Sequence, residues 1–121
     1  YQARVSNYSE TLAKNRQRSG VAPNFVHSQD AAHLRATIIK CIDAGVHSLA
    51  LIHDDYGTHA AHTDILHRLI RESFVEQYTE FDPLQSFKTW QEAIAKTPMP
   101  DIPAMGTLNV EDVLKSDYFF G

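Results

Sequence analysis

Two adjacent carboxylates follow a short apolar run in this sequence. In the stretch SLALIHDDYGTHAAH (residues 48–62), His53, Asp54 and Asp55 come directly after four apolar residues. A carboxylate buried without a partner costs several kcal/mol, so acids at this position are either solvated or bound to a cation. Magnesium takes oxygen ligands, and a strand packed beneath helices would hold one carboxylate rigidly. A polar β-turn is the ordinary alternative, because Asp-Asp-Tyr-Gly is common turn chemistry.

Histidines near these acids suggest a second kind of chemistry. All seven histidines of the chain lie between residues 27 and 67. Histidine and aspartate are the ligands of metal phosphohydrolases that carry a His-Asp doublet on a helix, but here the doublet follows an apolar strand. His62 and His67 are five positions apart, unlike the i, i+4 pair that binds zinc from one helix face. The spacing favours surface histidines at His33, His47, His62 and His67, with a phosphohydrolase as the alternative.

Composition limits the remaining functions. The chain has 121 residues, enough for one domain with a core. Its formal charge of −4 argues against a free-standing polycation that binds nucleic acid. The single cysteine, Cys41, excludes an internal disulfide and shares a helical face with apolar residues, which predicts a buried thiol. No apolar run is long enough to span a membrane, and the motifs of phosphate-binding loops, dinucleotide folds, paired-cysteine sites and serine hydrolases do not occur.

Two helices and a strand are predicted around the acids. Ser28 suits a helix N-cap and Gly45 the position after a helix end. Between them, apolar residues recur at helical spacing: Leu34, Ile38, Cys41 and Ile42. HSLALIH (residues 47–53) is typical of a short buried strand. A second helix, from residue 60 or 63 to Tyr78, carries an apolar stripe (Ile65, Leu66, Leu69, Ile70, Phe74 and Val75) opposite a polar face (His67, Arg68, Arg71, Glu72 and Glu76).

The flanking parts are patterned more weakly. A helix is predicted over residues 9–18 and ended by Gly20. An extended segment over residues 21–30 follows, because Pro23 disfavours helix at the residue before it. Beyond the second helix, the sequence predicts a helix that begins at Pro83, a proline-punctuated loop over residues 97–106, and a last short helix with Asn109 as its cap.

Four stretches of the chain occur together, in this order, in one protein family. They are APNFVHSQDAAHL (22–34), LALIHDDYGTHAA (49–61), LHRLIRESFVEQY (66–78) and LNVEDVLKSDYFFG (108–121). The sequence resembles the last segment of the single-subunit, phage-type DNA-directed RNA polymerases, a family with phage and mitochondrial members. The resemblance extends from about residue 20 to Gly121. It implies a nucleotidyltransferase that acts in transcription.

The resemblance implies roles for five residues. Asp54 matches one of two aspartates that bind catalytic Mg²⁺ in the family. His27 matches a histidine near the ribose of the incoming nucleotide, and His53 would lie beside the primer end and the metal. Gly57 and Thr58 would shape the hairpin. The position after the aspartate is usually small or uncharged in relatives, so Asp55 is interpreted as a solvated turn residue.

The resemblance also implies a fold. The expected class is α+β and mostly helical, with helices around a short antiparallel β-hairpin that forms the C-terminal part of a polymerase palm, followed by a helical appendix. The expected segments are residues 1–20 (N-terminal helix), 21–79 (hairpin with flanking helices) and 80–121 (appendix).

The function is expected to depend on a larger enzyme. The family's second catalytic aspartate and its nucleotide-binding helix have no match in this sequence, so the chain alone is expected to be inactive. Its expected partners are a DNA template, the RNA product, ribonucleoside triphosphates and the N-terminal part of the polymerase. The expected location is the cytoplasm of an infected or lysogenic bacterium, with mitochondria as the alternative.

Two other functions are weighed beside the polymerase. One is the His-Asp phosphohydrolase, which several histidines holding iron, manganese or zinc would favour. The other is a non-catalytic remnant or interaction module. Apolar stripes that pack on the missing part would be exposed in the isolated chain, so self-association is expected, and sedimentation at rising concentration measures it.

Overall fold

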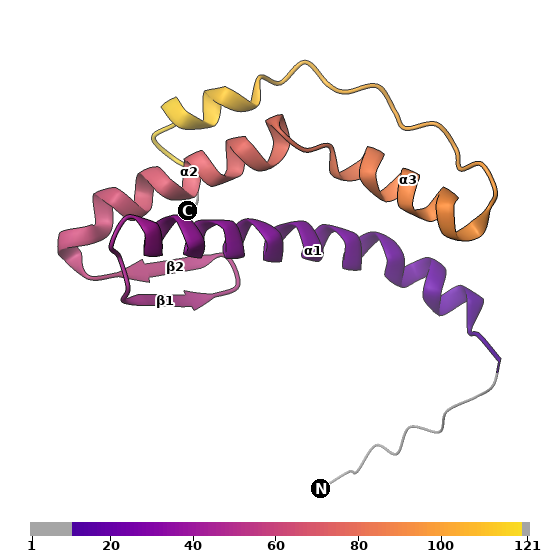
Figure 1. Ribbon diagram of the computed structural model, residues 1–121, viewed down its shortest axis with the longest axis horizontal. Helices are drawn as coiled ribbons and strands as arrows, with labels where there is room; N and C mark the ends of the chain where they lie inside the picture. Colours follow the sequence, from indigo (N-terminus) through magenta and orange to yellow (C-terminus); the bar gives the residue numbers. More distant parts are fainter. Residues whose placement is uncertain (1–10, 120–121) are drawn as a thin grey trace, which may run out of the picture.

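A long helix lies alongside a shorter one, with a small hairpin packed against both (Figure 1). The computed structural model describes residues 11–119. Its elements in chain order are α1 (Lys14–Asp43), β1 (Leu49–Ile52), β2 (Asp55–Thr58), the 3-10 helix η1 (Ala60–His62), α2 (Thr63–Thr79), α3 (Pro83–Ala95) and the 3-10 helix η2 (Val110–Lys115). The expected class, mostly helical α+β with one antiparallel hairpin, is confirmed.

Helix α1 is longer than the sequence suggested. It passes through Gly20 and Pro23 without a break, so the predicted helix end at Gly20 and the extended segment over 21–30 are wrong. The expected segment boundary between residues 20 and 21 falls inside α1. The first residues of the predicted helix over 9–18, Ser9 and Glu10, lie outside the described residues.

Tertiary contacts offset the cost of the proline inside α1. An interior proline removes a helical hydrogen bond and costs about 3 kcal/mol. In compensation, Phe25 packs on Phe87 of α3 with ring centroids 5.1 Å apart, and the Gln77 side chain of α2 donates a hydrogen bond to the Gln29 carbonyl at 3.1 Å. Local propensity therefore loses to packing in this part of the chain. Ser28 is not a cap either, because its hydroxyl donates to the Phe25 carbonyl within the helix.

The end of α1 leads directly into the hairpin. Gly45 has φ 83°, the left-handed conformation predicted for the residue that ends this helix. Val46 follows, fully buried, with its N–H donating to the Cys41 carbonyl at 2.8 Å. Strands β1 and β2 then pair antiparallel, with Ile52 opposite Asp55 and Leu49 opposite Thr58. The hairpin is thus fixed to the C-terminal end of α1 by a buried side chain.

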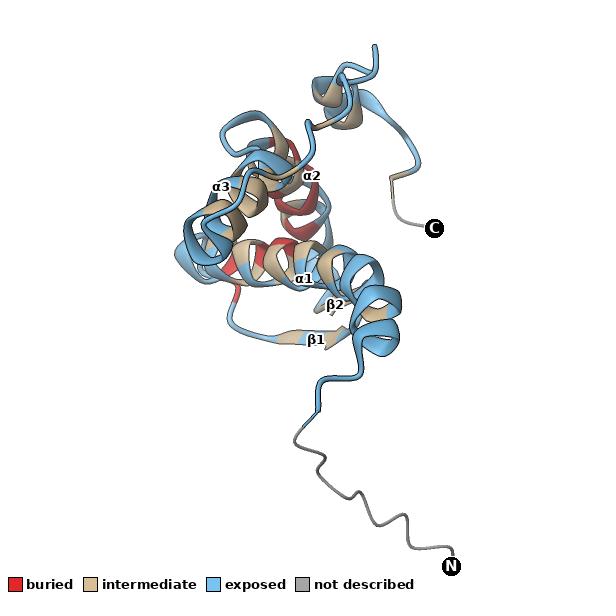
Figure 2. Cartoon of the chain, turned by 90° about the vertical axis from the view of Figure 1, so that its right-hand side faces the viewer, coloured by how far each residue is buried: buried red, intermediate tan, exposed pale blue. Residues whose placement is uncertain are grey.

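The core lies where α1, α2 and the hairpin meet. It consists of Cys41, Val46, Leu66, Leu69 and Ile70. Figure 2 shows the buried residues on α1 and α2 where the two helices face each other. The predicted buried thiol and the predicted apolar stripe of α2 are confirmed.

The buried face of α1 differs from the predicted one. It consists of His33, Thr37 and Cys41, whereas Leu34 and Ile38 are half-buried and the Ile42 side chain is 47% exposed. The buried row is therefore shifted by one position along the helix from the predicted apolar row, and it includes two polar residues.

The C-terminal elements begin as predicted. Asp82 caps α3 by accepting a hydrogen bond from the Gln85 N–H at 2.9 Å, and Pro83 is the first helical residue. Asn109 caps η2 by accepting from the Glu111 N–H at 3.2 Å. Helix η2 packs on α2. Among the described residues, no helix combines the length and apolar character needed to cross a membrane.

Candidate functional site

The hairpin turn consists of His53 and Asp54. Because Ile52 pairs with Asp55, only these two residues connect the strands. His53 has φ 56°, a left-handed conformation that histidine adopts more readily than most residues with a side chain. Asp54 follows at the tip, and both side chains are exposed. The hairpin therefore presents the Asp54 carboxylate at its tip, with Asp55 next to it at the start of β2.

Gly57 and Thr58 lie beyond the turn, inside β2. Gly57 pairs with Ala50, and a Cβ added to it would lie 3.5 Å from the Cβ and carbonyl oxygen of Ala50, which is ordinary contact. The Thr58 hydroxyl donates to the Ser48 carbonyl at 2.8 Å and ties the open end of the hairpin. The tight turn itself is therefore made by His53 and Asp54.

Asp54 borders a hollow between the hairpin, α2 and the C-terminal segment. The hollow has a volume of about 560 Å³ and is lined by Asp54, Asp55, Tyr56, Thr63, Leu66, His67, Ile70, Arg71, Asp117 and Phe119. Both acids of the doublet reach it, although they stand next to each other in sequence. A ligand in this hollow would meet carboxylates from the hairpin side and the buried face of α2 from the other side.

His27 and His53 border a second hollow, on the other side of the hairpin tip. Its volume is about 590 Å³, and its lining includes His27, Asp30, Ala31 and Leu34 of α1 with Leu51 and His53 of the hairpin. The two histidines named by the resemblance are far apart in sequence, yet the fold brings them to one surface. His27 reaches this position from the middle of α1, not from an extended segment.

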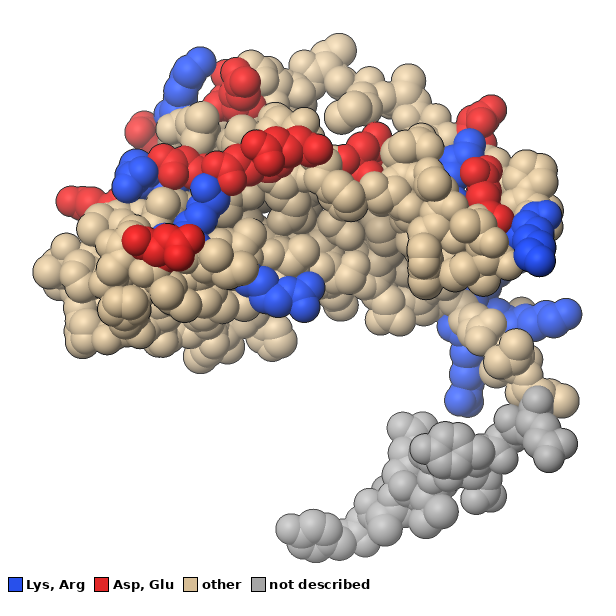
Figure 3. All heavy atoms as spheres, in the orientation of Figure 1, with Lys and Arg blue, Asp and Glu red and all other residues tan. Residues whose placement is uncertain are grey.

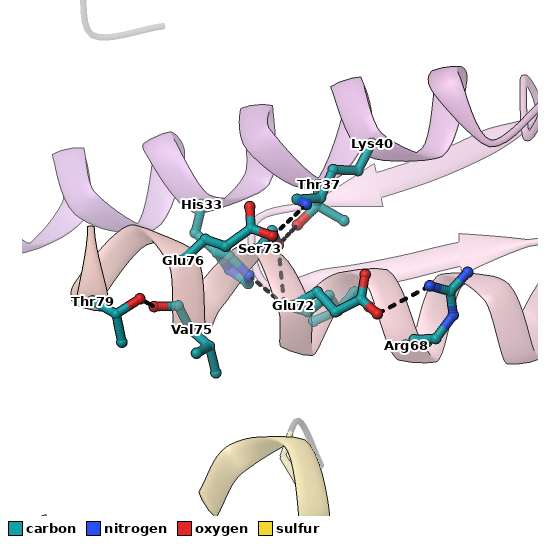
Figure 4. A network of polar contacts seen from close by, with 10 residues as sticks. His33, Thr37, Lys40, Arg68, Glu72, Ser73, Val75, Glu76 and Thr79 are labelled. Atoms are coloured by element: carbon teal, nitrogen blue, oxygen red, sulfur yellow. Dashed lines mark hydrogen bonds and ion pairs between the residues drawn. The ribbon is translucent and has the colours of Figure 1, made fainter. Parts of the chain in front are cut away.

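A buried polar network joins α1 to α2 (Figure 4). The Nε2 atom of His33 lies 2.9 Å from the Ile70 carbonyl oxygen, and Thr37 Oγ1 lies 2.7 Å from Ser73 Oγ. Ser73 also donates to the Ile70 carbonyl at 3.0 Å. All of these side chains are buried, so their hydrogen bonds are made away from water. These contacts align the two helices beside the core.

Tyr56 connects this network to the hairpin. Its hydroxyl lies 3.4 Å from Nδ1 of His33, and the two rings are 6.0 Å apart between centroids. Burial lowers the pKa of His33, against smaller opposing effects of the Ile70 hydrogen bond and the Asp30 carboxylate. Burial also raises the pKa of Tyr56, and the carboxylates of Asp30 and Asp54 add to that rise. The pair is therefore neutral near pH 7.

Arg71 forms the wall of the hollow next to Asp54. Its guanidinium donates to the carbonyls of His67 (3.0 Å), Ser116 (3.1 Å) and Asp117 (3.4 Å), and it lies 5.7 Å from the centroid of the Phe119 ring. These contacts hold the C-terminal segment against α2. The predicted polar face of α2 is wrong at this position, because Arg71 is only 6% exposed.

His33 corrects a second expectation. It was predicted as a surface histidine, but only 3% of it is exposed. His47 and His67 are exposed as predicted. The spacing of His33, Thr37 and Cys41 at i, i+4 and i+8 is the signal that places His33 on the core face of α1. The signal for Arg71 is weaker, because its partners are backbone carbonyls far away in sequence.

The charges around the hairpin are mixed. Figure 3 shows acidic side chains gathered over α2 and η2 on one face, and basic ones beside several of them and at the start of α1. Three of the ion pairs on this surface are Lys40–Glu76 (2.7 Å), Arg68–Glu72 (3.0 Å) and Lys115–Asp112 (3.5 Å). This face is not a continuous basic surface of the kind that binds nucleic acid by charge alone.

The donor set at the turn suits one ligand of a larger magnesium site. Within residues 11–119, no three histidine, cysteine or acidic side chains are grouped so that they could hold a metal ion. Magnesium is usually held by one or two carboxylates together with water and substrate phosphates. An exposed carboxylate at a rigid tip fits such a site as one contributor.

Comparison with known proteins decides the family. Residues 2–99 match the family model of the DNA-dependent RNA polymerases. The chain belongs to this family. It is 39% identical over 122 residues to T7 RNA polymerase of Escherichia phage T7, which covers 95% of this chain and 14% of that polymerase. It is 42% identical over 111 residues to the DNA-directed RNA polymerase of Enterobacteria phage T3, with 88% and 13% covered.

An RNA polymerase of a plant organelle is also similar to this chain. The mitochondrial DNA-directed RNA polymerase 1 of Nicotiana sylvestris is 38% identical over 112 residues, which covers 93% of this chain and 11% of that enzyme. The predicted relationship to phage-type single-subunit polymerases is confirmed. The chain spans about a seventh of the length of T7 RNA polymerase, so it corresponds to one segment of these relatives.

Proposed function

We propose that Asp54 is a ligand of the catalytic Mg²⁺ ion in nucleotidyl transfer by a complete DNA-directed RNA polymerase. The observation that carries this proposal is the position of Asp54, exposed at the tip of a two-residue turn in a polymerase family member. When bound, magnesium neutralises charge on the reacting phosphate and promotes attack by the RNA 3′-hydroxyl. Asp55 is proposed to remain solvated.

The hairpin restrains the backbone at Asp54. Strand pairing fixes the turn, Thr58 closes the open end, and Tyr56 anchors β2 to the buried network. A ligand on such a support loses little conformational freedom when it binds, which favours correct orientation of the reacting groups. The role of this chain is therefore to hold one oxygen ligand at a fixed place and angle.

His27 and His53 are proposed to face the nucleic acid and nucleotide. They border one hollow beside the turn, and both are exposed. Histidine can donate to a ribose hydroxyl or a phosphate oxygen from either ring nitrogen. Gly57 and Thr58 are proposed to act only through the shape of the hairpin.

The remaining ligands are proposed to come from the rest of a polymerase. Asp54 is the proposed ligand at the turn, and among the described residues no three histidine, cysteine or acidic side chains are grouped to hold a metal ion, so further ligands are needed for metal-assisted phosphoryl transfer. The proposed partners are a DNA template, the RNA product, ribonucleoside triphosphates and the N-terminal part of the enzyme. The proposed location is that of transcription in a phage-infected or lysogenic bacterium, or in an organelle as in the plant relative.

Substitution of Asp54 tests the proposal. In a complete polymerase that contains this segment, Asp54→Ala should lower kcat about 10²-fold or more, because charge stabilisation at the reacting phosphate is lost. Binding of the DNA template should persist, since the exposed turn contributes no core packing. Near-normal turnover in run-off transcription would refute the assignment.

A further inference from the structure

The buried imidazole of His33 connects the three elements around the hairpin. It stands on α1, its Nε2 lies 2.9 Å from the Ile70 carbonyl of α2, and its Nδ1 lies 3.4 Å from the Tyr56 hydroxyl of β2. A carbonyl oxygen only accepts, so Nε2 carries the hydrogen. In the neutral ring, Nδ1 is then an acceptor for the Tyr56 hydroxyl. One side chain thus joins α1, α2 and β2.

We propose that His33 is a positioning residue for Asp54, which sets where the hairpin tip stands relative to α1 and α2. The inference rests on the proposed role of Asp54 as a magnesium ligand. Tyr56 stands two residues after Asp54 and pairs with Leu51 of β1. A displacement of Tyr56 therefore passes into the turn through one short stretch of backbone.

The surroundings of His33 fix both its ring plane and its charge. The Phe74 ring meets it edge to face, with centroids 5.5 Å apart, so rotation of the imidazole is restricted. Burial lowers the pKa of His33, which favours the neutral ring with one donor and one acceptor. The donor, Nε2–H, faces the Ile70 carbonyl, and the acceptor, Nδ1, faces the Tyr56 hydroxyl. A charged ring would carry a hydrogen on both nitrogens, so the Tyr56 hydroxyl would have to accept from Nδ1 instead of donating to it.

Three substitutions at the pair separate positioning from plain stability. His33→Leu removes both hydrogen bonds, His33→Gln retains an amide N–H that can reach the Ile70 carbonyl, and Tyr56→Phe removes only the hydroxyl. His47→Leu is the matched control, because His47 is exposed. Each variant is made in a complete polymerase that contains this segment. Steady-state kcat, nucleotide KM and the Mg²⁺ concentration for half-maximal rate are measured, with active enzyme counted by template binding.

The expected result is a selective effect on the reacting geometry. His33→Leu should lower kcat about ten-fold or more and raise the required Mg²⁺ concentration, because small displacements of a reacting group are costly. Nucleotide KM should change little, and His47→Leu should match the parent enzyme. His33→Gln should recover part of the loss, because it retains the Ile70 contact without the Nδ1 acceptor for Tyr56.

Two outcomes would overturn the inference. One is a His33→Leu enzyme that melts at lower temperature but retains kcat and Mg²⁺ requirement per folded molecule, which means a structural role only. If His33→Leu does not fold, Tyr56→Phe decides, and unchanged kcat and Mg²⁺ requirement in that variant would overturn it equally. Asp54→Ala is measured in parallel: if that variant stays active, the proposed function fails, whereas an inactive Asp54→Ala with an unaffected pair refutes the positioning alone.

Discussion

At the scale of residues, exposed and buried polar groups have different tasks. Asp54 and His53 stand at the tip of the turn, in contact with solvent. His33, Thr37 and Ser73 lie underneath, buried and hydrogen-bonded to one another or to the Ile70 carbonyl. Buried polar groups cost stability unless paired, so this network also specifies how α1 and α2 align. The exposed side chains at the turn are thus carried by elements that buried polar groups hold together.

The low pKa of His33 predicts how stability depends on pH. Burial holds the pKa of His33 in the folded chain below its ordinary value of 6.5, so the unfolded chain binds the proton more readily. The contribution of neutral His33 to the free energy of unfolding is therefore fully present above about pH 6.5. It is lost as the pH falls from there through the pKa of His33 in the folded chain. Two titratable groups act on this ring: Asp30 interacts with it electrostatically, and the Tyr56 hydroxyl lies within hydrogen-bond distance of Nδ1.

Urea unfolding from about pH 7.5 to 5.5 measures this dependence as the free energy of unfolding. His33→Gln should flatten the decline, because the glutamine side chain does not titrate. His47→Gln is the control, since His47 is exposed, and it should retain the slope of the parent chain. Equal slopes in the parent and His33→Gln would contradict the prediction.

At the scale of elements, patterns with strong apolar periodicity were predictable and patterns that depend on distant contacts were not. The stripe of α2, the strand β1, the start of α3 at Pro83 and the Asn109 cap of η2 followed from spacing and local chemistry. The continuity of α1 through Pro23 did not, because it depends on contacts with α3 and α2. Local rules place a helix end at such a proline, and packing reverses them.

The residues of the candidate site likewise include some that the sequence predicted and some that it did not. The sequence pointed to Asp54 and its neighbour His53 because carboxylates directly after an apolar strand must be solvated or bound to a cation. The resemblance added His27. It did not point to the burial of His33 or Arg71, whose partners are carbonyls of Ile70 and Ser116. Every residue has a backbone carbonyl, so the sequence does not indicate which carbonyl a buried side chain will contact. Contacts of this kind are visible only once the chain is folded.

Gly45 provides a test of how α1 is joined to the hairpin. Its φ of 83° is unfavourable for a residue with a side chain, although an added Cβ would meet nothing within 4 Å. Gly45→Ala should therefore lower the free energy of unfolding by about 1 kcal/mol through backbone strain alone. Gly106→Ala is the matched control, with equal space and no left-handed φ, and should change stability by less than about 0.5 kcal/mol. Equal effects of the two substitutions in urea unfolding would contradict this account.

At the scale of the whole molecule, the chain presents apolar surface as well as a site. Trp90 and Ile94 of α3 are each 60% exposed, and Phe81 is 52% exposed. A groove of about 1030 Å³ between the first half of α1 and α3 is lined by apolar side chains, among them Phe25, Phe87 and Trp90, and by a similar number of polar ones. Together with a length of 14% of T7 RNA polymerase, this surface supports the proposal that the chain works within a larger enzyme.

The isolated 121-residue chain should not extend RNA, because the adjacent carboxylates of Asp54 and Asp55 do not complete a two-metal site, and the described residues contain no group of three or more possible metal ligands. A primer-extension assay with template, ribonucleoside triphosphates and Mg²⁺ measures this directly. Addition of a separately produced N-terminal part of a related polymerase is the positive arm and should restore synthesis. Template-dependent extension by the chain alone would contradict the proposal.

The most direct test of the central claim compares the two adjacent acids. Asp54→Ala and Asp55→Ala remove the same group from neighbouring exposed positions that border the same hollow. In a complete polymerase that contains this segment, run-off turnover at saturating Mg²⁺ and nucleotide should fall about 10²-fold or more for Asp54→Ala. It should stay near the parent value for Asp55→Ala. Equal losses, or a larger loss for Asp55→Ala, would contradict the assignment of Asp54 as the magnesium ligand.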